Sequence, residues 1–309
     1  MKFKFLGSLL MAALTGVTLT SCLGEPESET SFSIKVSNMI IPDDLGEEVK
    51  VTHNCIYNLR IDGVKNKIIV STSSLSLNGN SNLSFTSNAM DGLVIAGFGS
   101  ESGSFARGTA KLSNGQEVSS INGYYTSIVN YYEVTGDPFP VTSVRPMLVM
   151  NYRVGNSTVR TFCADSFFRG ETTTSYSLGP NAPEKNFTTS DAVYRVKFAE
   201  DMKTASVVIY NVQFAEEMQK KLTAVVLKDL PVTLGHRGYI ISGTDLVPEM
   251  LDDSGLTPMP RYTFDRISIE SADAQLTSIR CDYTVAGSFK GVFEGITVSK
   301  FEAGTGSPQ

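Results

Sequence analysis

Apolar and polar residues alternate with a period of two along most of the chain. In one stretch the apolar positions are Tyr194, Val196 and Phe198, with Arg195 and Lys197 between them. A later stretch alternates in the same way through Val208, Tyr210, Val212 and Phe214. Because successive side chains of a strand point to opposite faces, the pattern predicts β-strands with one face in a core and one in solvent.

Short clusters of turn-forming residues separate these stretches. They are Glu200-Asp201, Glu216-Glu217, Gly235-His236-Arg237-Gly238, Asp252-Asp253-Ser254-Gly255, Ser271-Ala272-Asp273 and Gly287. From about Ala192 to Ser299 this punctuation gives roughly eight strands with short connections, which predicts an up-and-down antiparallel barrel and leaves a sandwich open. The alternation slips between Phe264 and Ile267, and a slip of this kind predicts a bulge.

The first half of the chain repeats the pattern of the second. The matching segments are Ile56–Ile61 with Val193–Phe198, Leu75–Leu77 with Val212–Phe214, and Phe168–Gly170 with Phe289–Gly291. Their order and near-constant spacing favour duplication of one β unit over chance similarity between strands. We therefore predict an all-β protein of two tandem antiparallel barrel or sandwich domains. The first covers 32–175 and the second 191–302, with a linker at 176–190 and a disordered tail at 303–309.

The N-terminal pattern of charged, apolar and small residues predicts an export signal. Lys2 and Lys4 precede an apolar stretch from Phe5 to about Leu19, and Leu19-Thr20-Ser21-Cys22 follows. The apolar stretch is short for a membrane-spanning helix, and small residues precede the cysteine. The segment resembles a bacterial lipoprotein signal, which implies a signal peptide at 1–21, cleavage between Ser21 and Cys22, and fatty acyl groups on Cys22. An ordinary signal peptide with a chance cysteine is the alternative.

Acidic residues follow Cys22 closely. Glu25, Glu27 and Glu29 lie in a stretch with little apolar area, so 22–31 is predicted to be a flexible tether. The stretch also resembles the signal that sends lipoproteins of Bacteroidetes to the cell surface, although a solvated linker has the same composition. This resemblance implies an outer-membrane protein, lipid-anchored and exposed at the cell surface.

The second half, from Val193 through Gly295, is similar in overall pattern to calycin-like barrel domains of Bacteroidetes lipoproteins. The similarity implies calycin-like up-and-down barrels and an extracytoplasmic binding or structural role. It supplies no catalytic or ligand-binding residues.

Charge and cysteine content narrow the function further. The 309 residues have a net charge of −6, and cleavage after Ser21 would remove Lys2 and Lys4. An acidic body without a basic cluster is a poor partner for nucleic acid. Cys55, Cys163 and Cys281 form an odd set, which argues against a disulfide framework. A single Cys55–Cys163 bond stays open, and Cys281 is predicted to be a buried apolar residue.

The chain offers little sign of catalysis. Its two histidines, His53 and His236, lack metal-ligand spacing, and neither a nucleophile elbow nor a phosphate-binding glycine loop is present. The acidic stretch 249–260 is predicted to be a solvated loop that caps the barrel rather than a cation site. We predict a protein that is not an enzyme and has neither cofactor nor metal.

Tyrosines gather at Tyr124, Tyr125, Tyr131 and Tyr132. Neighbours on a strand point to opposite faces, so one of each pair should point outward and could contact a ligand or partner; the alternative is packing near a domain interface. Two functions follow. The first is a lipoprotein that binds a small molecule, glycan or peptide in a barrel or between the halves. The second is a structural or adhesion subunit of the envelope that acts through protein contacts.

Overall fold

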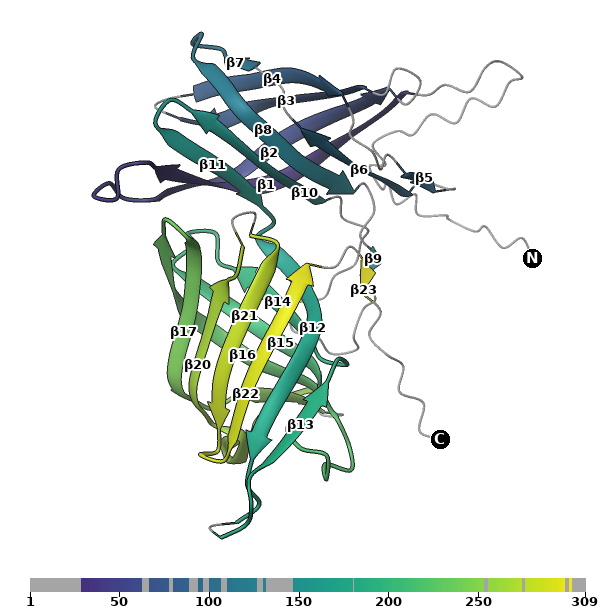
Figure 1. The fold of residues 1–309 in the computed structure, drawn as a ribbon, viewed down its shortest axis with the longest axis vertical. Helices are drawn as coiled ribbons and strands as arrows, with labels where there is room; N and C mark the ends of the chain where they lie inside the picture. Colours follow the sequence, from purple (N-terminus) through teal and green to yellow (C-terminus); the bar gives the residue numbers. More distant parts are fainter. Residues whose placement is uncertain are drawn as a thin grey trace, which may run out of the picture.

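The computed structural model describes residues 29–62, 67–77, 80–88, 94–96, 100–106, 110–126, 130–131, 147–179, 181–252, 255–273, 276–297 and 300–301. These residues are almost entirely β-strand and turn, with one 3₁₀ helix at Pro260–Tyr262. None of the helical structure in these ranges is long and apolar enough to cross a membrane. Two β units lie one above the other in Figure 1.

The first unit is a curled antiparallel sheet. Its ring consists of β1 (Glu29–Pro42), β2 (Lys50–Asp62), β3 (Lys67–Ser76), β4 (Asn80–Asn88), β7 (Ala110–Leu112), β8 (Glu117–Thr126), β10 (Met147–Val154) and β11 (Ser157–Phe162). Each strand pairs with the next in this order, and β11 pairs back with β1. The short strand β7 completes the ring, and β6 (Ser100–Ala106) and β5 (Val94–Ala96) extend the sheet from β8.

The second unit is a closed eight-stranded antiparallel barrel. Its strands are β12 (Asp165–Tyr176), β14 (Val193–Phe198), β15 (Thr204–Val212), β16 (Leu222–Gly235), β17 (Gly238–Leu246), β20 (Phe264–Ser271), β21 (Ser278–Val285) and β22 (Phe289–Thr297). Pairing of β22 with β12 closes the ring. Both units therefore follow the same up-and-down order, and the predicted all-β fold class is confirmed.

Three further strands decorate the second barrel. β13 (Lys185–Thr189) pairs with the second half of β12. β18 (Glu249–Asp252) and β19 (Gly255–Pro258) form a hairpin that pairs with β16. The acidic stretch 249–260 is thus largely paired strand, and the prediction of a solvated loop was wrong because its apolar residues pack on the barrel, with Met250 only 5% exposed.

The predicted bulge near Phe264 is confirmed. The register of β20 against β21 shifts between Phe264 and Arg266. A similar shift separates Ala205 from Val207 on β15, opposite a segment of β16 in which Asp229 has φ 54°. Such bulges bend strands and increase their twist, which a closed barrel requires.

The chain passes between the units at Cys163–Ala164, earlier than the linker expected at 176–190. β12 belongs to the second barrel, and the segment between Tyr176 and Lys185 connects it to β13. The glycine and proline residues in that segment mark a hairpin connection rather than a domain boundary. Phe168–Gly170 and Phe289–Gly291 consequently lie on adjacent strands of one barrel, so they are not equivalent positions of two repeats.

The ends of the body also differ from the sequence prediction. Glu29–Ser31, placed in the tether, already pair with β2. Near the C-terminus, β23 (Lys300–Phe301) pairs in parallel with β9 (Asn130–Tyr131), so the last described residues return to the first half of the chain. Residues 303–309 lie outside the described residues.

Aromatic side chains fill the second barrel. Tyr194 stacks on Phe293 with ring centroids 3.9 Å apart. Phe214 contacts four further rings, those of Tyr262, Phe264, Tyr283 and Phe289, at centroid distances between 5.9 and 6.4 Å. Cys281 is fully buried in the same core, as predicted. The described interior is therefore packed with the protein's own side chains.

A second apolar layer covers part of the outer face of this barrel. Val208 and Tyr210 lie in it, whereas Val212 and Phe214 point inward, because Asn211 adopts φ 55° and breaks the alternation. Leu251 and Leu256 of the β18–β19 hairpin pack on this outer layer. The prediction of one dry face along β15 was wrong, since both faces are buried.

The two units share apolar packing where they meet. Met39, Ile41, Val49 and Phe162 of the first unit belong to the same core cluster as the barrel interior. The Phe162 ring meets that of Phe198 edge-on, with centroids 5.7 Å apart. This shared core holds the two units together, and the candidate site lies at the interface between them.

Candidate functional site

The predicted lipidation site lies outside the described residues. Neither Ser21 nor Cys22 is among them, so acylation at Cys22 stays a prediction. The three cysteines of the body are present as thiols, and the Cys55–Cys163 bond does not form in this structure. Cys55 is fully buried on β2, whereas Cys163 is half-buried at the junction of the units.

The structure places the described members of the predicted tyrosine surface in different environments. Tyr125 is fully buried in the core of the first unit. Tyr124 is half-buried, and its hydroxyl lies 3.2 Å from Thr297 Oγ1 of the second barrel. Tyr131 lies on β9, and Tyr132 is outside the described residues. Contact of Tyr131 and Tyr132 with a ligand stays a prediction.

A cleft of about 1120 Å³ lies where β11 of the first unit approaches the rim of the second barrel. Its floor is the outer face of strands β12, β22, β21, β20 and β17, and Arg160 on β11 forms the opposite side. The β16–β17 turn borders it: Arg160 Nη1 donates to the carbonyl of Arg237 at 3.3 Å, and His236 Nε2 lies 3.2 Å from the carbonyl of Asp44. The cleft is therefore bridged by contacts between the units.

Cross-strand pairing orders the side chains on the cleft floor. Arg169, Ile296 and Ser278 are neighbours across β12, β22 and β21. A second row runs through Glu294, Arg280, Glu270 and Ile240 on β22, β21, β20 and β17. Ile240 is 44% exposed and Ile296 65% exposed, so the floor presents apolar surface between charged groups.

The basic residues of the cleft are all arginines or histidine. Four arginines line it, and none of the lysines in the described ranges does. Arg280 is already neutralised, because it bonds Asp282 through Nε and Nη2 at 2.9 and 3.0 Å and Glu294 through Nη1 at 2.5 Å. Arg160, Arg169 and Arg237 form no ion pair within the described part of the chain. Asp273 and Glu270 line the same cleft, and the charge of Asp273 acts on Arg160, so the cleft carries charges of both signs.

Arg160 is the least hydrated of these three cations. Its side chain is half-buried between the units, and this burial lowers the pKa of its guanidinium, with the charge of Asp273 acting in the opposite sense. Asp273 itself is held in its loop by hydrogen bonds from Thr277 N, Thr277 Oγ1 and Ser278 Oγ. A cation that is already partly desolvated gains more from an incoming anion than a fully hydrated one does.

A smaller groove of about 600 Å³ lies along the same interface, near Cys163 and Glu200. Its arginine, Arg195, is 1% exposed and makes a bidentate pair with Asp165, with both N–O distances 2.8 Å. Burial alone would lower the pKa of Arg195, but hydrogen bonding and charge attraction from Asp165 outweigh it and raise the pKa. This guanidinium is committed to the fold, so the larger cleft is the better candidate site.

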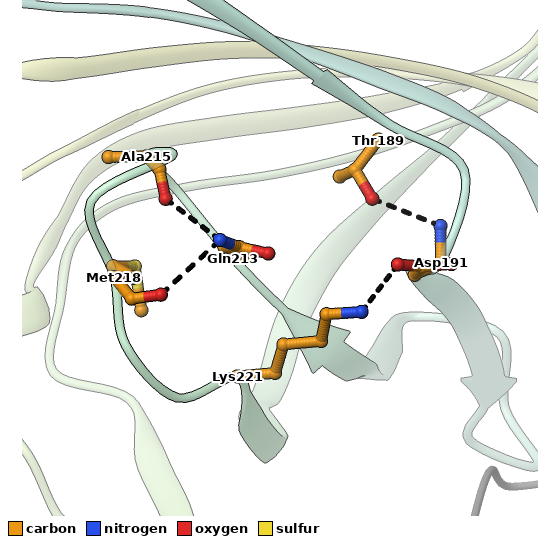
Figure 2. Close-up of polar contacts among 6 residues, drawn as sticks. All are labelled: Thr189, Asp191, Gln213, Ala215, Met218 and Lys221. Carbon is orange, nitrogen blue, oxygen red and sulfur yellow. Dashed lines mark hydrogen bonds and ion pairs between the residues drawn. The ribbon is translucent and has the colours of Figure 1, made fainter. Parts of the chain in front are cut away.

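At the other end of the barrel, the loop between β15 and β16 is clamped to the β12–β13–β14 region. Figure 2 shows Lys221 reaching Asp191, while Gln213 Nε2 donates to the carbonyls of Ala215 and Met218 within the loop. The Lys221 Nζ–Asp191 Oδ2 distance is 2.5 Å. A second clamp joins Glu217 to Lys185 of β13 and to the hydroxyl of Tyr176. Hydrogen bonds from Lys185 and then Tyr176 lower the pKa of Glu217 to about 2.

This shift predicts acid sensitivity of the loop clamp. The folded-state pKa of Glu217 lies below the ordinary value of 4.5, so the clamp stabilises the fold fully above pH 4.5 and loses its contribution as the pH falls toward 2. In Glu217→Gln, we expect reduced stability at pH 7 and a difference from wild type that shrinks as the pH falls from 4.5 toward 2. Urea midpoints measured across this range test it. The adjacent, exposed Glu216→Gln is the control, and an equal effect there would contradict the assignment.

Sequence reasoning missed the residues of the cleft. Arg160, Arg169 and Arg237 each occupy an ordinary polar position of a strand or turn, where a solvated charge is expected. The signal that could have found the cleft is the pair Ile240 and Ile296. Both are apolar residues at strand positions where the alternation predicts a side chain that faces solvent. Only ring closure and the contact between units bring these five residues together.

Comparison with known proteins found similarity among solved structures. No protein-family model matches the chain. No curated protein matches it either. Among solved structures, a double mutant of the vaccine antigen transferrin binding protein B from Haemophilus parasuis Hp5 aligns over 88% of this chain and 78% of its own, with 9% sequence identity and a TM-score of 0.25. At this TM-score the alignment carries no argument about the site.

Proposed function

We propose that this protein is a lipid-anchored lipoprotein of the cell envelope, exposed at the surface of the outer membrane, which binds a ligand in the cleft between its two β units. Cys22 is its anchor, and the acidic residues behind it hold the body away from the bilayer, as in the Bacteroidetes lipoproteins that the N-terminus resembles. The protein acts by binding rather than by catalysis.

The cleft is the observation that carries this proposal. Its volume of about 1120 Å³ lies just above the usual range for ligand sites, and its exposed isoleucines and its arginines supply both apolar and polar contacts. The barrel interior, which is where a calycin-like protein would hold a small molecule, is occupied by Phe214, Phe293 and their aromatic neighbours. The groove between the halves is therefore the favoured site.

The test separates binding from location. The body without residues 1–22 is immobilised and exposed to envelope extract and culture medium, in parallel with a cleft-blocked Ser278→Trp variant. We expect one or more species retained by wild type and lost in the variant, whose unchanged circular dichroism shows that it folds. Protease treatment of intact cells should remove the body. Equal retention by both forms would refute the cleft, and full protection from protease would refute surface exposure.

A role as a structural or adhesion subunit is the second candidate. Leu45, in the loop after β1, is 80% exposed and lies outside the cleft. In this second candidate, Leu45 would contact a neighbouring protein of the envelope. Retention that is lost in the Leu45→Ser variant but unchanged in the Ser278→Trp variant would favour this candidate.

A further inference from the structure

The loop between β15 and β16 carries the aromatic side chain that fills one end of the second barrel. Phe214 is 1% exposed, although Glu216 and Glu217 of the same loop are exposed. The rings around Phe214 come from the 3₁₀ helix and from β20, β21 and β22, and they are those of Tyr262, Phe264, Tyr283 and Phe289. We call residues 213–221 the latch, because this loop places a ring of its own among rings of the barrel.

Backbone hydrogen bonds hold the latch to itself and not to the barrel wall. The pairing of β15 with β16 ends at Val212 and Leu222, and Met218 N donates to a carbonyl within the latch. Among the described residues, no backbone-to-backbone hydrogen bond joins the latch to another element. The Phe214 N–H donates to Met218 Sδ at 3.1 Å, and a thioether is a weak acceptor. The latch therefore lacks the ladder that couples each wall strand to its neighbours.

Exposed side chains fasten the latch to the β12–β13–β14 region. Lys221 pairs with Asp191, as Figure 2 shows, and Glu217 pairs with Lys185 and accepts a hydrogen bond from the Tyr176 hydroxyl. The side chains of the two ion pairs are between 39% and 56% exposed, and ion pairs with this exposure add little to stability. Opening the latch breaks these contacts and leaves the strand pairing of the barrel intact.

Opening also withdraws the Phe214 ring from a position close to the surface. Phe289, which contacts that ring at a centroid distance of 5.9 Å, also lines an open groove of about 670 Å³ at this end of the barrel. The barrel centre stays filled, because Tyr194 and Phe293 stack there on strands of the wall. The space that opening vacates is therefore the size of one aromatic side chain and adjoins solvent.

We propose that the latch opens as a unit while the barrel stays folded, and that a flat apolar molecule then takes the place of the Phe214 ring. The four surrounding rings favour an aromatic occupant, since two of them meet Phe214 edge-on and two are tilted against it, all within 6.4 Å between centroids. This second site is separate from the cleft, and its occupancy is independent of the proposed function.

Hydrogen exchange in the body without residues 1–22 tests the opening. The Met218 amide should have a protection factor at least about tenfold lower than that of Val208, which lies in the β15–β16 ladder, because local opening costs less than unfolding of the barrel. Glu217→Gln combined with Lys221→Gln should lower the protection of Met218 at least about threefold further and leave that of Val208 unchanged.

The matched control is Glu249→Gln combined with Lys228→Gln. It removes one ion pair of similar exposure that lies outside the latch, with the same change of charge. We expect the exchange of Met218 and its affinity for small aromatic molecules to remain as in wild type.

Titration of ¹⁵N-labelled protein with indole tests the vacated site. Indole should shift the amides of Phe264 and Phe289 saturably. It should bind at least about threefold more tightly to the Glu217→Gln, Lys221→Gln variant, because a larger open fraction raises the apparent affinity. Phe214→Ala, which removes the competing ring, should bind indole at least as tightly as that variant does.

Three results would overturn the proposal. The first is exchange of Met218 only together with Val208, which would make the latch part of the barrel's single unfolding unit. The second is equal exchange and equal indole binding in wild type and in the variant without the two ion pairs; neither comparison requires Phe214→Ala to fold. The third is indole binding that shifts Ser278 and not Phe289, which would place it in the cleft. Each of them leaves the proposed function standing, since Ser278→Trp tests the cleft separately.

Discussion

Asp165→Ala is expected to destabilise the protein by about 3–5 kcal/mol. The substitution removes the carboxylate that pairs with Arg195 in a bidentate contact and leaves a guanidinium that is only 1% exposed. The ring of Phe167, 5.0 Å from that guanidinium, gives partial compensation but cannot replace an anion. The measurement is the free energy of unfolding from urea titration.

Two further variants show that burial causes this effect. Asp43→Ala breaks the Arg153–Asp43 pair, whose side chains are 40% and 45% exposed, and should cost less than about 1 kcal/mol. Replacing both buried partners, with Asp165→Leu and Arg195→Met, should recover most of the lost stability, since no unpaired charge is left inside. A cost for Asp165→Ala as small as that for Asp43→Ala would contradict this account.

Cys22→Ala is expected to abolish membrane attachment. Each buried methylene of an acyl chain contributes about 0.8 kcal/mol, so a lipidated cysteine with several chains is held almost irreversibly, and the variant would lack those chains. The variant should appear in the soluble fraction or remain as uncleaved precursor. Fractionation, together with the intact mass of the N-terminal peptide, measures both outcomes.

Ser21→Ala serves as the matched control for this variant. It keeps a small residue at the position before the cysteine, so cleavage and acylation should proceed as in wild type. If Cys22→Ala fractionated and migrated like wild type, the anchor would be rejected. The binding cleft would be unaffected by that result, because its residues lie in the folded body.

The local sequence pattern predicted the strands well. Features that depend on contacts between residues far apart in the sequence could not be predicted from it. Alternation and turn residues predicted the seven barrel strands after Ala192 and the bulge after Phe264, because both depend on neighbours in sequence; the eighth strand, β12, was assigned to the other domain. Burial of Arg195 depends on Asp165, 30 residues earlier, and alternation alone placed it in solvent. The domain boundary was misplaced for a related reason: a Gly and Pro cluster marks a turn without showing which sheet each flanking strand joins.

The cleft could not be predicted from the sequence, because its residues come from distant segments that meet only in the folded protein. Arg160 and Arg237 are 77 residues apart and meet only because β11 reaches the rim of the other barrel. Arg169 becomes their neighbour through ring closure between the first and last strands of the second unit. Each of these arginines is an ordinary polar residue in its own segment. The site exists only because the folded chain brings the three segments together.

The two-residue passage at Cys163–Ala164, together with the apolar packing across it, limits how this chain can be dissected. Expressing either half alone would leave Phe162 or Phe198 facing water and would strip the partner that covers Met39 and Ile41. Truncations designed at the Gly- and Pro-rich segment after Tyr176 would also remove a wall strand from the C-terminal barrel. Recombinant fragments for crystallisation or immunisation should therefore keep both halves in one polypeptide.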